Sequence, residues 1–153
     1  MKASRAIQIH VVKATPARGV GIIRLRKLAI SVLEKEGVHS AEISLALLNN
    51  QDMHRLNREF LQHDEPTDVI TFPFSPESSE CLQGEILVGV EVAQREARAR
   101  GHSLEEEVSL YLIHGLLHLC GHDDLRPVAR KKMRERERFH LRNLGLPNIG
   151  PEK

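Results

Sequence analysis

Two histidines four residues apart, His114 and His118, are the strongest chemical signal in the chain, within the segment HGLLHLCGHDD (114–124). Residues four apart lie on one face of an α-helix, one turn from each other, so both imidazoles can reach one cation. Leucine and isoleucine surround the pair, which indicates a buried helix, and Gly121 is expected to end that helix and reverse the chain. The segment therefore predicts a divalent metal site at the end of a buried helix.

The third ligand is expected among the side chains that follow the glycine turn. His122, Asp123 and Asp124 are candidates, and imidazole and carboxylate are both ordinary metal ligands. Cys120 lies roughly 200° around the helix from His118, so its side chain is expected to point away as a small buried apolar group. The residue types alone leave the choice of third ligand open.

The residue after the first histidine narrows the chemistry of such a site. Zinc peptidases of the H-E-x-x-H type place a glutamate there as general base, whereas this chain has Gly115. A metal-dependent peptidase is therefore disfavoured. Two histidines with Asp124 also match the ligand set of Fe(II) oxygenases, but in those enzymes the ligands usually lie on the strands of a barrel.

Periodicity places these residues in an α+β protein. It predicts strands over 5–13, 41–49, 69–72 and 85–90 and helices over 19–37, 51–61, 91–101, 104–120 and 126–144. Ser103 and Glu106 form a capping-box pattern before the metal-bearing helix, and Asn50 is expected to cap the helix over 51–61. The order β-α-β-α-β-β-α-α-α predicts one domain over 1–153, with a small four-stranded mixed sheet covered by about five helices.

Length and composition fit one globular domain. With 153 residues, 41% of them hydrophobic and 28% charged, the chain can bury a core. The two cysteines, Cys81 and Cys120, suit a reducing compartment better than a disulfide framework. No apolar run approaches the roughly 20 residues of a membrane span, and the first residues lack the pattern of a secretory signal. We therefore expect a cytoplasmic protein with no membrane partner.

Charge is unevenly distributed along the chain. Residues 1–36 and 126–142 each carry a net charge of +6, whereas residues 37–125 carry −11. An acidic centre between basic flanks can attract both a cation and a polyanion. The alternative is that these charges form ordinary solvated helix faces.

The segment 114–124 resembles the signature H-G-x-L-H-L-x-G-Y-D-H of the YbeY family, bacterial single-strand-specific endoribonucleases of ribosomal RNA maturation. LNREFLQHDEPTDVITFPF (56–74) and GEILV (84–88) are similar to two further blocks of that family, in the same order and with matching spacing. The resemblance runs from about residue 7 to residue 145. It implies three zinc-binding histidines and an arginine beside the metal that is essential for activity.

Residue by residue, the resemblance assigns His114 and His118 to the first two zinc ligands and Arg58 to the arginine beside the metal. It implies a catalytic role for His114 and for Arg58, whose planar guanidinium is suited to bind the substrate phosphate. The family's third histidine falls on Asp124 and its tyrosine on His122. Asp124 is the favoured third ligand, because the turn fixes which residue faces the metal, and His122 is the alternative.

An aspartate in place of the third histidine can change which metal ion the site prefers and whether the site is active. A carboxylate binds zinc, but it shifts the preference of a site toward harder ions such as Mn²⁺ or Mg²⁺. We therefore expect one Zn²⁺ per chain, with Mn²⁺ or another divalent ion as the alternative. A weakened site that is often empty is the third outcome.

The resemblance implies a metal-dependent endoribonuclease that cleaves single-stranded RNA. Its expected place is the maturation of the 3′ end of small-subunit ribosomal RNA and ribosome quality control, with the small subunit as partner. The competing hypothesis is a non-catalytic ribosome-assembly factor that binds RNA and has a degenerate metal site. Aromatic side chains are scarce and expected in the core, so the protein alone should read little base sequence.

Several other polar residues are expected to have structural or surface roles. Thr67 and Asp68 should hydrogen-bond within the turn that follows Pro66. The remaining histidines are expected at the surface or at helix caps, namely His10, His39, His54, His63, His102 and His140.

Overall fold

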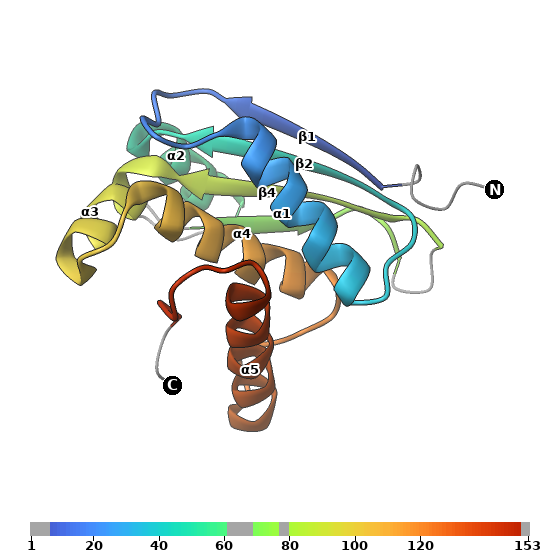
Figure 1. The fold of residues 1–153 in the computed structure, drawn as a ribbon. Helices are drawn as coiled ribbons and strands as arrows, with labels where there is room; N and C mark the ends of the chain where they lie inside the picture. The colour runs from blue at the N-terminus through green and yellow to red at the C-terminus, as the bar shows by residue number, and fades with distance from the viewer. Residues whose placement is uncertain (1–6, 61–68, 77–79, 151–153) are drawn as a thin grey trace.

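The computed structural model describes residues 7–60, 69–76 and 80–150 (Figure 1). In these residues the elements are β1 (Ile7–Lys13), α1 (Ile22–Lys35), β2 (Ala41–Leu48), α2 (Asn50–Phe60), β3 (Val69–Pro73), β4 (Leu82–Gly89), α3 (Val90–Arg100), α4 (Leu104–Leu119) and α5 (Pro127–Asn143). The predicted element order is confirmed. His63, Thr67 and Asp68 lie outside the described residues. Among the helices that are described, none has the length and apolar content to cross a membrane.

Four strands of the described residues form one mixed sheet, in the order β1-β2-β4-β3. β1, β2 and β4 run parallel, and β3 runs antiparallel to β4, with Pro73 opposite Gly84. β3 is therefore an edge strand, where a proline is tolerated because it removes no hydrogen bond from a central ladder. The predicted α+β class with a four-stranded mixed sheet is confirmed.

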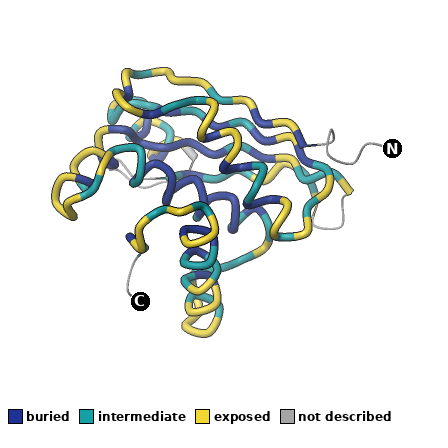
Figure 2. The backbone as a smooth tube through the Cα atoms, in the orientation of Figure 1, coloured by how far each residue is buried: buried dark blue, intermediate teal, exposed yellow. Residues whose placement is uncertain are grey.

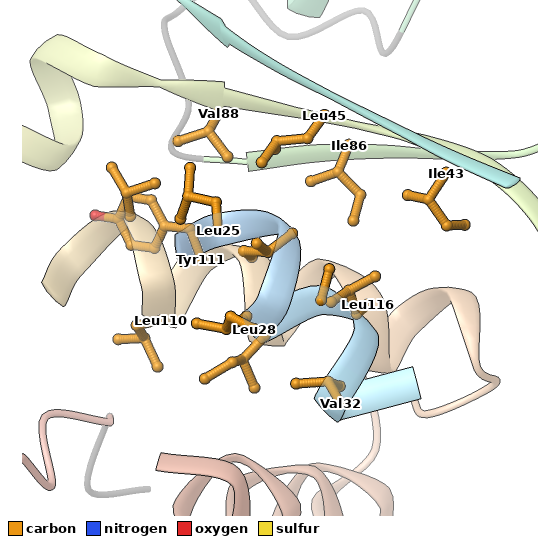
Figure 3. Packing of buried hydrophobic residues seen from close by; sticks show 14 of the residues in the cluster. Leu25, Leu28, Val32, Ile43, Leu45, Ile86, Val88, Leu110, Tyr111 and Leu116 are labelled. Carbon is orange, nitrogen blue, oxygen red and sulfur yellow. The ribbon is translucent and has the colours of Figure 1, made fainter. Parts of the chain in front are cut away.

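Helices α1 and α4 cover one face of the sheet, and α2 lies on the other. Figure 3 shows Ile86 of β4 pointing toward Leu28 of α1 and Leu116 of α4, within the main cluster of buried residues. The next residue of β4, Leu87, points to the opposite face, where it packs with Met53 of α2. In Figure 1, α5 lies beyond α4 and projects away from the sheet.

The structure can be compared with the predicted N-terminal caps of α4 and α2. At the start of α4 the predicted capping box is confirmed: Ser103 Oγ accepts from the N–H of Glu106 at 3.1 Å, and Glu106 Oε1 accepts from the N–H of Ser103 at 2.9 Å. The predicted cap of α2 is wrong by one residue. Asn49 rather than Asn50 caps this helix, since Asn49 Oδ1 accepts from the N–H of Asp52 at 2.8 Å.

Two glycines let α4 approach the sheet closely. A Cβ on Gly115 would lie 3.0 Å from Cγ2 of Ile86 and 3.2 Å from Cγ2 of Thr71. A Cβ on Gly84 would lie 2.8 Å from Cδ2 of Leu119. Gly115 thus faces the packed interface between α4 and the sheet, and a glutamate at this position would have to enter that interface. The packing argues against a peptidase-type base next to the first histidine.

Replacing Gly115 with valine is expected to lower the free energy of unfolding by about 2–3 kcal/mol, because overpacking a closed interface strains it. Gly115→Ala should cost less, since the helix propensity of alanine offsets up to about 1 kcal/mol. Chemical denaturation measures both losses. Unchanged denaturation midpoints in both variants would show that the interface has room for a side chain.

Candidate metal centre

The turn that follows α4 returns the chain toward the histidine pair. Gly121 has a φ of 102°, a left-handed conformation that glycine adopts without strain. The N–H of Gly121 donates to the carbonyl of His118 at 3.0 Å, and the N–H of His122 donates to the carbonyl of Leu117 at 2.9 Å. This Schellman pattern ends the helix where the sequence predicts and turns Asp124 back toward α4.

His114, His118 and Asp124 form a group that can hold a metal ion. Asp124 Oδ2 lies 3.4 Å from His114 Nε2, and Asp124 Oδ1 lies 3.7 Å from His118 Nε2. One ligand atom from each residue lies within 4.8 Å of the other two. The imidazole rings meet edge to face with their centroids 4.7 Å apart. The structure therefore brings together the two histidines of the helical pair and the favoured aspartate.

This donor set fits a divalent ion. Bonds of about 2.0–2.2 Å at tetrahedral angles separate neighbouring ligand atoms by roughly 3.3–3.6 Å. The two aspartate–imidazole distances, 3.4 and 3.7 Å, are close to that spacing. Two imidazole nitrogens and one carboxylate would leave the fourth position of a tetrahedral ion to water or substrate, as in catalytic rather than structural zinc sites.

A buried carboxylate on α5 orients His114. Glu137 is 1% exposed, and its Oε2 lies 2.6 Å from Nδ1 of His114. Arg134 donates to both oxygens of Glu137, at 2.9 and 3.0 Å, which fixes the position of the carboxylate. Nδ1 of His114 then carries the proton and donates it to Glu137, so the Nε2 lone pair faces the ligand group. Such carboxylate–histidine pairs fix the tautomer and ring orientation of metal-binding histidines.

His118 is held in its neutral form. Burial, followed by the neighbouring His114, lowers the pKa of His118 below its usual value of 6.5, and this outweighs the opposing effects of Asp124 and Asp123. Metal binding requires a neutral imidazole. The lowered pKa of His118 therefore favours the neutral imidazole that metal binding requires.

His122, the alternative third ligand, points away from the group. Its Nε2 lies 3.0 Å from Oε1 of Glu36, at the end of α1. Cys120 also lies outside the group, and burial, together with the charge of Glu36, raises the pKa of its thiol to about 12. The geometry thus favours Asp124 over His122 and leaves Cys120 outside the group, while the ligand roles themselves stay predictions.

Glu36 is the centre of a buried polar cluster. Its side chain is 8% exposed, and its Oε2 accepts from Nη2 of Arg136 and from Nε2 of His140, both at 2.7 Å. His140 is 0% exposed, so its predicted place at the surface or at a cap is wrong. His102 lies between the C-cap of α3 and the N-cap of α4, as predicted for a capping position, but its side chain is only 7% exposed and binds the buried Glu107. In both cases a buried carboxylate replaces water as the partner of the imidazole.

The cluster predicts how stability depends on pH. Burial raises the pKa of Glu36, but hydrogen bonds from His140, His122 and Arg136 outweigh burial and lower the pKa from 4.5 to about 2. Because the pKa is lower in the folded state, ionised Glu36 stabilises the fold above pH 4.5, and this contribution is lost as the pH falls toward 2. Thermal unfolding of wild type and Glu36→Gln, compared from neutral pH downward, should show a difference that shrinks over this range. A difference that grows in acid would contradict the assignment.

Arg58 lies in the last turn of α2 and is exposed. Helix α2 packs on the face of the sheet opposite α4, and residues 61–68, which follow it, lie outside the described residues. The exposed position is compatible with binding a polyanion, and the predicted place of Arg58 beside the metal stays a prediction. His10 and His39 are exposed, as expected.

Two buried carboxylates near the group were not predicted from the sequence: Glu137, which binds His114, and Glu36, which binds His122. Helical spacing carried a signal for both. Glu137 lies four residues from Met133 and four from Leu141, on the buried stripe of α5. Glu36 likewise lies four residues after the buried Val32 of α1. A charged residue in register with a buried stripe predicts a buried charge that needs a partner.

The fold and this geometry define an α+β protein in which one helix and the turn after it bring two histidines and an aspartate to a candidate metal centre. The family model described as Endoribonuclease YbeY matches residues 18–145. The chain belongs to the YbeY family.

Individual relatives agree with this assignment. The protein named Endoribonuclease YbeY from Heliobacterium modesticaldum is 38% identical, over 81% of this chain and 83% of the relative. The protein of the same name from Chlorobium luteolum is 36% identical, over 90% of this chain and 97% of the relative. The solution structure of TM1509 from Thermotoga maritima superposes with a TM-score of 0.69 at 24% identity, covering 95% of this chain and 97% of that one. This last match supports the fold alone.

Proposed function

We propose that the protein is a divalent-metal-dependent endoribonuclease that hydrolyses single-stranded RNA. The observation that carries this proposal is the group of His114, His118 and Asp124 at the end of α4, in a chain of the YbeY family. Relatives named endoribonuclease support RNA as the substrate class. The proposed cofactor is one Zn²⁺ per chain, with Mn²⁺ as the alternative because Asp124 contributes a hard oxygen ligand.

Each group of the site has a separate role in the proposed hydrolysis of the phosphodiester bond. His114, His118 and Asp124 would hold a divalent ion, which would supply Lewis acidity toward a phosphoryl oxygen or a water molecule. His114 presents Nε2 to the site because Glu137 accepts the proton of Nδ1. Arg58 binds the phosphate and stabilises the negative charge that develops on its oxygens.

The start of α5 is the surface that we propose for the RNA backbone next to the metal. Arg126 follows Asp124 by two residues, and Figure 2 shows that the first turns of α5 are largely exposed. Lys131 and Lys132 lie on the same stretch and are exposed as well. Lysine and arginine on this helix would attract phosphates without reading base sequence.

Replacing Lys131 and Lys132 with serine is expected to weaken the binding of single-stranded RNA. Loss of two phosphate contacts should reduce the slope of log affinity against log salt by about 1.4. The matched control replaces Lys27 and Lys35, two exposed lysines of α1, with serine. Fluorescence anisotropy with a labelled RNA at several salt concentrations measures both double variants, and equal losses would argue against a specific role for α5.

Strand selectivity tests the proposed function. Wild-type protein supplied with Zn²⁺ or Mn²⁺ should cleave an end-labelled single-stranded RNA and leave the matching duplex intact. His118→Ala, which lacks one member of the group, should cleave neither substrate. Cleavage by this variant at the wild-type rate would contradict the proposal.

We further propose that the substrate is ribosomal RNA of the small subunit in the cytoplasm, since the sequence resembles enzymes of that process. A second candidate function is a non-catalytic ribosome-assembly factor. One observation favours it: aspartate stands at position 124, where the family signature has histidine. Wild-type protein that binds the small subunit and takes up metal, yet cleaves no single-stranded RNA, would favour this second candidate.

A further inference from the structure

Glu36, directly after the last residue of α1, holds together three parts of the chain around the candidate metal centre. Its Oε1 binds Nε2 of His122 in the turn after α4, at 3.0 Å. Its Oε2 binds Arg136 and His140 of α5, each at 2.7 Å. These partners lie 86, 100 and 104 residues away in the sequence. One buried carboxylate therefore fixes α1, the turn and α5 relative to one another.

Glu36 can influence the metal centre first through the turn after α4, which carries Asp124. His122 is anchored twice: its N–H binds the carbonyl of Leu117, and its ring binds Glu36. Asp124 follows two residues later, so the path of its backbone depends on this anchor. The ring of His122 is also engaged in the bond to Glu36, which keeps a competing imidazole out of the group of His114, His118 and Asp124.

The second route runs through α5. Arg136 and His140 lie on either side of Glu137 in the sequence, and Glu137 orients His114. The guanidinium of Arg136 also lies 4.3 Å from the centroid of the Phe139 ring, which restricts its position. Glu36 thereby fixes the segment of α5 from which Glu137 reaches the metal-bearing helix.

We propose that Glu36 is a positioning residue of the metal centre: it fixes the turn that carries Asp124 and the segment of α5 that orients His114. The inference rests on the proposed function, because it concerns the metal site on which that function depends. Glu36 is not a member of the group formed by His114, His118 and Asp124. It acts through His122 and α5, so its effect should appear in metal binding itself.

A matched control lies at the other end of α4. Glu107 is 1% exposed, its Oε2 lies 3.5 Å from Nη1 of Arg100, and its Oε1 binds His102. It is thus a buried carboxylate with an arginine and a histidine partner, like Glu36. It lies about 10 Å along the helix from His114, at 1.5 Å per residue. Replacing either glutamate with glutamine should lower thermal stability, but only the replacement of Glu36 should also weaken metal binding.

Zinc affinity measured by competition with a chromophoric chelator tests the inference. Glu36→Gln is expected to bind Zn²⁺ about 10–100-fold more weakly than wild type, the range for partners that orient metal ligands. Glu107→Gln is expected to retain the wild-type affinity. The absorption spectrum of the Co²⁺-loaded protein should change for Glu36→Gln and stay unchanged for Glu107→Gln, because only the first change alters the coordination geometry.

Glu36→Asp keeps the charge and shortens the side chain by one methylene, so it is expected to retain more affinity than Glu36→Gln and provides the test if the latter does not fold. Wild-type affinity and an unchanged Co²⁺ spectrum in the Glu36 variants would overturn the inference and leave the proposed function intact. Loss of affinity in Glu107→Gln equal to that in Glu36→Gln would also overturn it. Wild-type protein that binds neither Zn²⁺ nor Co²⁺ would overturn the proposed function and the inference together.

Discussion

Replacing Asp124 with alanine is expected to lower Zn²⁺ affinity by more than about 100-fold, beyond the cost of losing a partner that only orients a ligand. Asp124 supplies the carboxylate of the group, and without it the two imidazoles would have to hold the ion alone. RNA cleavage should fall together with metal content. Mass spectrometry of the bound metal and calorimetric titration measure the loss.

Two neighbours of Asp124 are matched controls. Asp123→Ala removes a carboxylate whose Oδ1 accepts from the N–H of Leu125 at 3.0 Å, and it should leave metal binding intact. His122→Ala should lose less affinity than Asp124→Ala, because the ring of His122 binds Glu36 and influences the group only through the path of the turn. Loss of metal in His122→Ala with retention in Asp124→Ala would assign the third-ligand role to His122 and contradict the geometry of the turn.

Replacing Glu137 with glutamine is expected to lower Zn²⁺ affinity about 10–100-fold, with a parallel loss of RNA cleavage. The amide has nearly the same size but no charge, so Nδ1 of His114 faces a weaker, neutral acceptor or an NH₂ donor in place of the carboxylate. Arg134 then faces an amide in place of a carboxylate. Because breaking a buried charge pair costs about 3–5 kcal/mol, a loss of stability should accompany the loss of metal.

The control for Glu137 is Glu135, an exposed glutamate on the same helix. Glu135→Gln should change neither Zn²⁺ affinity nor the denaturation midpoint. Titration and chemical denaturation of the two variants side by side make the comparison. Wild-type Zn²⁺ affinity in Glu137→Gln would mean that this carboxylate does not set the orientation of His114.

The part of the site that depends on local structure was predictable from the sequence. His114 and His118 lie one turn apart on any α-helix, and the glycine after them ends that helix with a known turn. The capping box of Ser103 and Glu106 depends on residues only three apart and is confirmed. Alternation and helical spacing likewise sufficed for the order of the strands and helices.

The part that depends on long-range contacts was not predictable in the same way. The orientation of His122 away from the ligand group depends on Glu36, which lies 86 residues earlier in the sequence. Without that partner, His122 and Asp124 are chemically plausible ligands in the same turn. His140 was assigned to the surface or a cap because its buried carboxylate partner is also distant, 104 residues away. Local patterns show that a residue is polar, but they do not show which remote group satisfies it.

Reconstitution of RNA cleavage with metal is the most direct test of the proposed metal centre. Protein purified without a metal-binding tag is stripped with a chelator, and the cleavage of single-stranded RNA is followed as Zn²⁺ or Mn²⁺ is added. We predict no cleavage by the stripped protein, a rise in rate in proportion to the metal added, and a plateau at about one ion per chain. Cleavage that survives complete removal of metal, or protein that takes up one ion per chain and still cleaves no RNA, would contradict a metal-dependent endoribonuclease.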